Sequence, residues 1–378
     1  MLKNRRLLFV INDLDFFISH RLPIAIAARN AGMDVHVAAA DGSVTTHLQD
    51  QGMVFHRTPI TRSGIHPWRE VRTLFKFYQL CRTLRPDIVH SVTIKGVIYG
   101  GIAARLACVR AVVSAIPGLG YVFTESGLLA ALRKGIVSSL YRVALNGPHS
   151  RVIFQNPDDM AMFTRSAIVR YDACVLIRGA GVDLREFRPS PEPPEQPIVV
   201  VFASRMLWAK GVGEFVSAAT RLRNERFNVR FVLVGASDWG SPSAVPERQL
   251  RLWHESGTVE WWRRRDDMPH VFSQSHIVCL PTTYGEGVPK VLIEAAASAR
   301  PIVATNVPGC REIVRDGDNG ILVPPRDETA LVDALRQLIV DPERRYSMGL
   351  RGREIAEREF AINKVVDETL AVYRAMVA

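Results

Sequence analysis

The sequence has 378 residues, of which 47% are apolar and 23% charged, as is ordinary for a soluble globular protein. That length exceeds what one typical hydrophobic core supports, so two domains are expected. The five cysteines are scattered without a C-x-x-C pair, which argues against a disulfide framework and against a zinc site.

The net charge of +10 is unevenly distributed along the chain. Residues 1–188 contain 24 Lys and Arg against 13 Asp and Glu, whereas residues 189–378 contain 24 against 25. A basic first half favours an anionic partner, such as a membrane, a nucleic acid or a phosphorylated substrate. The short apolar run at residues 7–11 predicts a first strand rather than a signal peptide. No run approaches the length of a membrane span, so we expect a cytoplasmic protein.

In residues 1–188, short apolar runs that predict buried strands alternate with patterns that predict helices. The expected strands cover residues 5–10, 35–39, 54–58, 88–90, 111–116, 151–155 and 173–177. The expected helices cover residues 21–30, 44–51, 68–84, 98–107 and 126–145. Such an alternation predicts a parallel, doubly wound sheet.

The predicted helix 126–145 carries Arg133, Lys134 and Arg142 among aliphatic residues. One interpretation is a surface helix packed on the sheet. The other is a basic amphipathic helix that lies against a membrane, and the positive charge of the first half supports it.

A proline-rich segment separates the two halves of the chain. Residues 189–197 contain five prolines in nine positions, which predicts an extended linker and a domain boundary. After it, strands are expected at 198–203, 230–235, 259–261, 277–280, 302–305 and 320–323, and helices at 212–223, from Lys290 and at 328–339, with further helices to the end. The predicted fold class is α/β, with two Rossmann-like doubly wound domains, 1–188 and 189–359, facing each other across a cleft.

The clearest chemical pattern is the stretch Tyr284-Gly-Glu-Gly-Val-Pro-Lys-Val-Leu-Ile-Glu294. It follows a predicted buried strand, and Pro289 suits the first position of the helix that follows. Gly285 and Gly287 allow a ligand to approach the backbone closely, and the N–H groups of the helix N-terminus attract a phosphate.

Two carboxylates bracket this loop, since Glu286 lies in it and Glu294 lies in the helix. Carboxylates accept hydrogen bonds from sugar hydroxyls. Phosphate-binding N–H groups between two such carboxylates predict a nucleotide-sugar pocket, and an ordinary turn with two solvated glutamates is the alternative.

Arg205 and Lys210 follow the predicted strand 198–203 and can both reach one diphosphate. Arginine binds phosphate with two parallel hydrogen bonds and lysine acts as a point charge. Both also neutralise the charge that develops on a leaving nucleoside diphosphate. Two solvated surface cations are the alternative for either residue alone.

The second half resembles the family 4 glycosyltransferases, which are retaining enzymes of the GT-B architecture. The motifs that carry the resemblance are the E-x7-E of Glu286 and Glu294, Ser204–Gly211, Trp262–Pro269, Val307–Glu312, Asn319–Pro324 and Gly181–Pro189. It implies that Glu294 holds the nucleotide ribose, that Glu286 contacts donor-sugar hydroxyls, and that no metal or other cofactor is needed. The implied donor-binding set is Arg205, Lys210, Arg265, Gly285, Glu286, Gly287, Val288 and Glu294. It further implies that a C-terminal helix, at about 360–378, packs back onto the first domain.

The first half resembles a bacterial subgroup that acts on polyisoprenyl-diphosphate-linked sugars in surface-polysaccharide assembly. The residues concerned are Asn12–Arg21, His90–Lys95 and Gly118–Thr124. The implied acceptor-binding residues are Asp15, His20, Arg21, Lys95 and Tyr121. Val92 stands where many members have an active-site histidine. His90, Thr93 or Lys95 is then expected to substitute for it, and His90 joins Glu286, Arg205 and Lys210 as a catalytic candidate. The alternative for His90 is a structural role.

Asp13-Leu-Asp15 is a D-x-D sequence, the metal motif of the GT-A glycosyltransferases. Because it follows the first strand of a chain with two Rossmann-like halves, we interpret it as a loop rather than as a metal site.

We therefore expect a retaining hexosyl- or N-acetylhexosaminyltransferase. Its donor is a nucleotide sugar, by resemblance a UDP-sugar, and its acceptor is a polyisoprenyl-diphosphate-linked saccharide in polysaccharide, O-antigen or capsule assembly. We expect it at an anionic membrane surface, on the inner face of the plasma membrane, without nucleic acid. The alternative is a nucleotide-sugar epimerase of the same architecture. A nucleic-acid binder is disfavoured by the near-neutral second half, and a dehydrogenase by the lack of G-x-G-x-x-G after the first strand.

Overall fold

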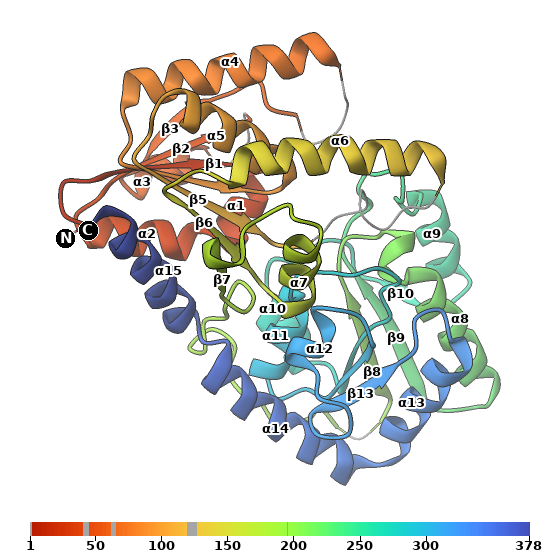
Figure 1. The fold of residues 1–378 in the computed structure, drawn as a ribbon. Coiled ribbons are helices and arrows are strands. Elements are labelled where there is room, and N and C mark those ends of the chain that lie inside the picture. The colour runs from red at the N-terminus through yellow and green to blue at the C-terminus, as the bar shows by residue number, and fades with distance from the viewer. Residues whose placement is uncertain (1, 41–44, 62–65, 119–126, 195) are drawn as a thin grey trace. The chain divides into compact units, whose positions relative to one another are not determined.

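The computed structural model describes the whole chain except residues 1, 41–44, 62–65, 119–126 and 195. It divides into two compact units (Figure 1). The first unit comprises Met1–Ala180 and Ile362–Ala378, and the second comprises Gly181–Ala361. Among the described residues, no helix combines the length and the apolarity that crossing a bilayer requires.

The first unit contains a parallel sheet with the strand order β3-β2-β1-β4-β5-β6-β7 in the described part of the chain. Its strands are β1 (Arg6–Val10), β2 (Asp34–Ala39), β3 (Val54–Arg57), β4 (Ile88–Val92), β5 (Ala111–Ile116), β6 (Ser150–Phe154) and β7 (Cys174–Leu176). Its helices are α1 (Leu14–His20), α2 (Leu22–Asn30), α3 (Thr45–Asp50), α4 (Pro67–Leu84), α5 (Ile94–Leu106), α6 (Leu128–Leu145), α7 (Pro157–Arg165), a 3₁₀ turn (Tyr171–Ala173) and α15 (Ile362–Val377).

Both faces of this sheet are covered by helices, which is why its strands read as continuous apolar runs. Leu7 and Phe9 of β1 pack with residues of α2 and α15. Leu8 and Val10 of the same strand pack on the opposite face with residues of α4 and α5. Helix α5 is the neighbour of both α4 and α6 on that face.

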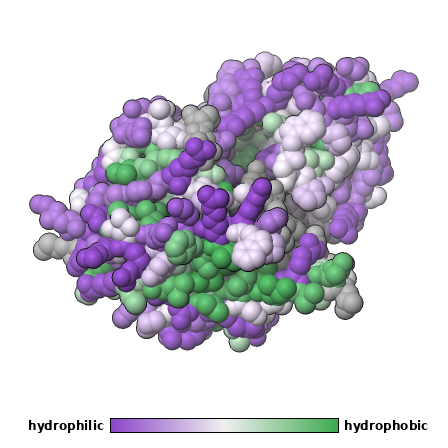
Figure 2. Space-filling model, turned by 90° about the horizontal axis from the view of Figure 1, so that it is seen from above, coloured by the Kyte–Doolittle hydropathy of each residue, from purple (hydrophilic) through white to green (hydrophobic). Residues whose placement is uncertain are grey.

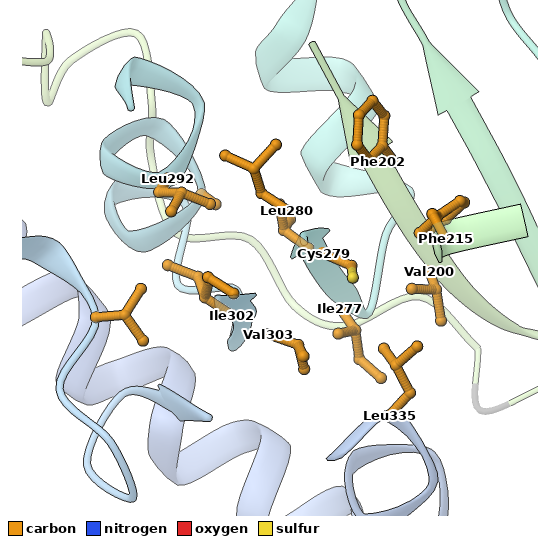
Figure 3. Packing of buried hydrophobic residues seen from close by; sticks show 14 of the residues in the cluster. Val200, Phe202, Phe215, Ile277, Cys279, Leu280, Leu292, Ile302, Val303 and Leu335 are labelled. Carbon is orange, nitrogen blue, oxygen red and sulfur yellow. The ribbon is translucent and has the colours of Figure 1, made fainter. Parts of the chain in front are cut away.

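The second unit contains a parallel sheet with the order β10-β9-β8-β11-β12-β13 over the described residues. Its strands are β8 (Ile198–Ala203), β9 (Val229–Val234), β10 (Glu260–Trp261), β11 (Ile277–Leu280), β12 (Ile302–Thr305) and β13 (Gly320–Val323). Its helices are a 3₁₀ turn (Trp208–Lys210), α8 (Val212–Asn224), α9 (Glu247–Glu255), α10 (Met268–Ser273), α11 (Lys290–Ala297), α12 (Cys310–Ile313), α13 (Glu328–Val340) and α14 (Pro342–Glu359). Figure 3 shows strand residues such as Cys279 packing among helix residues such as Phe215 and Leu335.

The strand order of each sheet reverses direction at one place, between β1 and β4 in the first unit and between β8 and β11 in the second. Ligands of doubly wound sheets bind outside the carboxyl ends of the strands at such a place. The two parallel α/β domains expected from the sequence are therefore confirmed, and each has one position that favours a ligand.

The proline-rich segment belongs to the second unit, so the division of the chain lies at Ala180–Gly181 and not at the expected residue 188. Two buried arginines hold the segment. Arg300 donates to the Ser190 and Pro191 carbonyls at 3.0 and 3.1 Å, and Arg345 forms an ion pair with Glu192 at 3.2 Å. The sequence pattern shows a break in the βα alternation but not which domain holds the segment.

Residues 13–15, expected as a loop, form the start of helix α1. The Asp13 carboxylate caps this helix by accepting a hydrogen bond from the Phe16 N–H at 3.0 Å. Asp13 is therefore engaged as an N-cap, a common role for aspartate. Pro289 likewise lies at the N-cap of α11 rather than at its first helical position.

Candidate active site

The loops that follow β8 and β11 are joined in the second unit. The Ala209 carbonyl accepts hydrogen bonds from the Thr283 N–H at 2.9 Å and from the Thr282 hydroxyl at 3.2 Å. Gly211 has φ +85°, and a Cβ there would lie 2.0 Å from the Pro281 carbonyl oxygen. Glycine is therefore required at this position for the two loops to lie against each other.

Lys210 and Glu286 meet where these loops join. The Lys210 ammonium donates a hydrogen bond to Glu286 Oε2, and each side chain is only 11% exposed. The ammonium also lies 5.4 Å from the centre of the Tyr284 ring. Burial lowers the pKa of Lys210, but Glu286 and Tyr284 together raise it above its ordinary value. Lys210 is therefore a buried cation at neutral pH, as binding of a diphosphate requires.

Arg205 is the second cation at this place. Its side chain is half exposed, and Nη1 lies 2.6 Å from the Asp238 carboxylate in the loop after β9. The charge of Arg205 opposes the elevation of the Lys210 pKa, so the two cations lie close enough to interact. The structure therefore brings together Arg205, Lys210 and Glu286, as the sequence predicts. Asp238 was not among the expected site residues, although its position in the loop after a strand is typical of ligand-binding residues in doubly wound sheets.

Glu294 lies on the second turn of α11 and is 7% exposed. Its Oε1 atom is 3.0 Å from the Lys290 ammonium one turn earlier. Burial raises the pKa of Glu294 above its usual value, although Lys290 opposes this effect. The E-x7-E spacing thus places one carboxylate in the loop and one, held by Lys290, in the helix.

The loop after β12 supports the loop that contains Gly285 and Gly287, which we call the glycine loop. Gly309 has φ +82°, and a Cβ there would lie 1.3 Å from the Gly287 carbonyl oxygen, closer than any two non-bonded atoms can come. A Cβ on Gly285, by contrast, would meet no neighbour closer than 4.0 Å. Packing within the unit therefore requires glycine at position 309 and leaves Gly285 open. Val288 is 6% exposed, so its side chain belongs to the core and its backbone is what a donor can contact.

A cavity of about 250 Å³ opens near the loop after β10. Its lining includes Trp239, Trp261, Arg263 and Arg264. Arg265, the expected donor-binding residue of this loop, does not line it. Arg265 instead forms hydrogen bonds with Asp267 at 2.7 and 2.5 Å and lies over the Trp262 ring. The expected role of Arg265 in donor binding stays a prediction.

In the first unit, His90 does not face solvent. It is 1% exposed, its ring lies 5.0 Å from that of Phe9, and Nδ1 lies 2.5 Å from the Tyr373 hydroxyl of α15. A side chain in this place cannot reach a sugar substrate, so the expectation of a catalytic His90 is corrected. The structural alternative fits, because β4 directs this side chain under α15.

The other residues expected to bind the acceptor are spread over the first unit. Lys95 forms an ion pair with Glu70 at 2.8 Å, and the His20 ring contacts the Ser19 hydroxyl at 2.6 Å and stacks on Phe16. Asp15 is exposed on α1, whereas Arg21 is buried. Tyr121 lies outside the described residues. Lys95 is thus engaged between α4 and α5, and only Arg21 is set apart by its burial.

Two family models match the chain. Residues 6–156 match the model described as "Glycosyl transferase 4-like", and residues 197–341 match "Glycosyl transferases group 1". The chain belongs to this family of glycosyltransferases. The glycosyltransferase also shares the GT-B fold of HepE from Anabaena, solved with UDP and glucose, with a TM-score of 0.80 and 20% identity over 98% of this chain and 100% of HepE.

Curated relatives of the glycosyltransferase match nearly its whole length. A Campylobacter jejuni protein is 26% identical over 94% of this chain and 97% of its own length, and is named N,N'-diacetylbacillosaminyl-diphospho-undecaprenol alpha-1,3-N-acetylgalactosaminyltransferase. An Escherichia coli protein is 24% identical over 92% of this chain and 90% of its own, and is named UDP-Gal:alpha-D-GlcNAc-diphosphoundecaprenol alpha-1,3-galactosyltransferase.

Proposed function

We propose that this glycosyltransferase transfers a sugar, with retention of configuration, from a UDP-sugar to a saccharide linked to a polyprenyl diphosphate. The observation that carries the donor assignment is the buried Lys210–Glu286 pair beside Arg205, at the place where the second sheet reverses direction. The acceptor assignment rests on the names of the Campylobacter and Escherichia relatives. Retention and the UDP base follow from the family resemblance, and the base also from the UDP bound to HepE.

In this proposal the two cations take the diphosphate of the donor. Lys210 exchanges its hydrogen bond with Glu286 for one with a phosphate oxygen, and Arg205 binds the same diphosphate from the half-exposed side. Glu286 then accepts hydrogen bonds from hydroxyls of the donor sugar, and Glu294 accepts those of the ribose. Because Arg205 and Lys210 neutralise the leaving UDP, the transfer proceeds without a metal.

A surface of the first unit suits the membrane that carries such an acceptor. Apolar side chains recur at intervals of three and four residues on two helices and are 38–79% exposed. They are Trp68, Val71 and Phe75 on α4, and Leu129, Leu132, Ile136, Leu140 and Val143 on α6. We call these two rows the apolar stripes. Figure 2, which looks down on this side, shows apolar surface gathered in a band with hydrophilic side chains beside it.

Charge identifies the membrane that the apolar stripes fit. Helix α6 contains Arg133, Lys134 and Arg142 and no acidic residue, and α4 contains four cations against Glu70 alone. An apolar row flanked by cations binds anionic lipid headgroups and buries its apolar side chains among the acyl chains. We therefore infer that α4 and α6 dock on an anionic membrane surface.

A transfer assay tests the proposed reaction. The protein, in EDTA, is incubated with a UDP-sugar and a polyprenyl-diphosphate-linked monosaccharide, and the product is isolated and its anomeric configuration read by NMR. The proposal predicts a disaccharide-lipid in which the transferred sugar keeps the donor configuration. Consumption of the UDP-sugar without acceptor would indicate an epimerase, and an inverted linkage would contradict retention.

A further inference from the structure

The segment that follows β9 packs against the segment that carries the two cations of the proposed donor site. We call residues 235–246, between β9 and α9, the β9–α9 loop. The Met206 N–H donates to the Ala236 carbonyl at 2.9 Å, and the Met206 carbonyl accepts from the Val245 N–H at 2.9 Å. Since β8 and β9 are neighbours in the second sheet, this loop lies at the carboxyl end of the sheet, beside the proposed donor site (Figure 1).

The β9–α9 loop also supports the short turn that ends at Lys210. The Ser243 carbonyl accepts from the Trp208 N–H at 2.7 Å, and the Ser243 hydroxyl accepts from the Ala209 N–H at 2.9 Å. Backbone hydrogen bonds thus join the two segments at both ends of the turn. The backbone of the β9–α9 loop is therefore fixed relative to the segment that carries both cations.

Asp238 is the residue of this loop that contacts Arg205. Its side chain is 11% exposed, and its carboxylate lies 2.6 Å from Nη1 of the half-exposed Arg205. The Asp238 carbonyl accepts from the Ser241 N–H at 2.9 Å, which closes a turn at this point of the loop. A short side chain on a fixed backbone thus holds the end of a long side chain that would otherwise sample many rotamers.

The contact with Asp238 leaves one edge of the Arg205 guanidinium available to a ligand. Among the described residues, the guanidinium makes no hydrogen bond other than that from Nη1 to Asp238. Its Nε and Nη2 atoms form the edge with which an arginine donates two parallel hydrogen bonds, as Arg230 does to Glu260 in this structure. One guanidinium can therefore bind Asp238 and a diphosphate at the same time.

Two roles for Asp238 are compatible with this contact, and the burial of its side chain decides between them. In the first role Asp238 competes with the donor and releases Arg205 when the donor binds. Release would take an ion pair from a largely buried carboxylate, which is unfavourable. In the second role Asp238 retains Arg205 and orients it, which avoids that loss and leaves the phosphate-binding edge in place.

We propose that Asp238 is a positioning residue for the donor: it holds the Arg205 guanidinium with the Nε–Nη2 edge available to the diphosphate, and it keeps this contact when the donor binds. The role rests on the proposed function, in which Arg205 binds the donor diphosphate. A side chain that is already ordered loses little conformational entropy on binding, so the affinity is higher. Asp238 acts through Arg205 and does not itself bind the donor.

Calorimetric titration of the full-length protein with UDP tests this role. We expect Asp238→Ala to raise the Kd of UDP about tenfold. Asp238→Asn keeps an acceptor oxygen for Arg205 and should recover most of the affinity that Asp238→Ala loses. In a protein that already carries Arg205→Met, Asp238→Ala should change the Kd by no more than about twofold, because the residue through which Asp238 acts is absent.

Asp318→Ala is the matched control for the loss of an ion pair. Asp318 pairs with Arg351 at 2.9 Å and precedes β13, so it lies at the amino end of a strand, away from the proposed donor site. This variant should bind UDP as the wild type does. Far-UV circular dichroism confirms that each variant is folded, and Asp238→Ser replaces Asp238→Ala if the alanine variant does not fold.

A lower Kd in Asp238→Ala than in the wild type would show competition and would overturn the proposal. An equal rise in Kd with and without Arg205 would also overturn it, since Asp238 would then only support the fold of the loop. If Arg205→Met weakens UDP binding and Asp238→Ala does not, the positioning role alone is refuted. UDP binding that Arg205→Met leaves unchanged would refute the proposed donor contact of Arg205 instead.

The transfer assay separates donor positioning from a general loss of structure. Asp238→Ala should raise KM for the UDP-sugar and leave KM for the lipid-linked acceptor unchanged, because Arg205 contacts only the donor in the proposed reaction. An equal increase of both KM values would contradict the positioning role.

Discussion

Lys210 and Glu286, 76 positions apart in the sequence, form an ion pair between the loops that follow two neighbouring strands. Both side chains are largely buried, so each charge stabilises the other, and a ligand that separates the pair must replace that interaction. This exchange is the basis of the proposed donor site.

Replacing Lys210 by alanine removes the cation that pairs with the buried Glu286 carboxylate. We expect Lys210→Ala to reduce transfer roughly 100- to 1,000-fold, because it removes a cation that stabilises the leaving diphosphate. We also expect it to lower the free energy of unfolding by about 3 kcal/mol. Turnover and urea unfolding measure the two effects.

Glu286→Gln is the matched control, because it keeps the shape and removes the charge. It should retain UDP binding by calorimetry and lose transfer. Loss of UDP binding in Glu286→Gln together with its retention in Lys210→Ala would reverse the roles assigned to the two residues.

Gly309 and Gly317 offer a matched pair for testing the support of the glycine loop. Both have positive φ, +82° and +76°, but a Cβ on Gly309 meets the Gly287 carbonyl at 1.3 Å, whereas none of its neighbours lies within 4 Å of a Cβ on Gly317. Gly317→Ala should cost roughly 1 kcal/mol of stability from backbone strain and keep UDP affinity. Gly309→Ala should cost more and weaken UDP binding at least tenfold. Equal UDP affinity in the two variants would show that the loop after β12 does not hold the glycine loop in the conformation that binds UDP.

The central strands of both sheets could be predicted from the sequence because they are buried on both faces. The run at β8 is apolar throughout, and those at β5 and β12 contain one small polar residue each, Ser114 and Thr305. The bounds of these three strands were predicted correctly. The short helices α1, α7 and α9 were not predicted. In α1 only Leu14 and Phe17 are buried, which is too few to show a helical period.

The donor site could be predicted in part, because loops at the carboxyl ends of adjacent parallel strands must lie near one another. That argument placed Arg205, Lys210 and Glu286 together. It could not show that Lys210 pairs with Glu286, that Asp238 pairs with Arg205, or that Tyr373 lies over His90. Those contacts depend on side-chain directions and on the return of the C-terminal helix to the first unit, neither of which leaves a local pattern.

Asp159 makes the stability of the first unit depend on pH. Burial raises the pKa of this carboxyl from 3.8 to about 7, although the Asn156 amide donates to it at 3.0 Å. The raised value means that the folded state holds this proton more tightly than the unfolded state. The contribution of Asp159 to the free energy of unfolding is therefore most favourable below pH 4, and it is lost as the pH rises towards 7.

Asp159→Asn, which cannot ionise, isolates this effect. We expect the variant to gain stability relative to the wild type as the pH is raised from 5 to 8, measured by urea unfolding at both values. A difference between the two proteins that stays constant with pH would contradict the assignment.

The apolar stripes are tested by a charge introduced into them. Leu132 on α6 is 62% exposed and Val340 on α13 is 61% exposed, so Leu132→Glu and Val340→Glu make the same change at equally exposed places. We expect Leu132→Glu to weaken binding to anionic vesicles about tenfold in a sedimentation assay, with little effect on stability. Val340→Glu should bind as the wild type does. Equal binding by all three proteins, or binding that persists at high salt on neutral vesicles, would argue against docking through α6.

The most direct test of the donor site is the melting temperature of the protein with UDP, GDP, ADP and NAD, each in EDTA. A ligand that binds only the folded state raises the melting temperature. We expect UDP to raise that of the wild type and not that of Lys210→Ala, and the other nucleotides to have smaller effects. Stabilisation of Lys210→Ala by UDP as strong as that of the wild type, or no response to any nucleoside diphosphate, would contradict the assignment of the Lys210–Glu286 site.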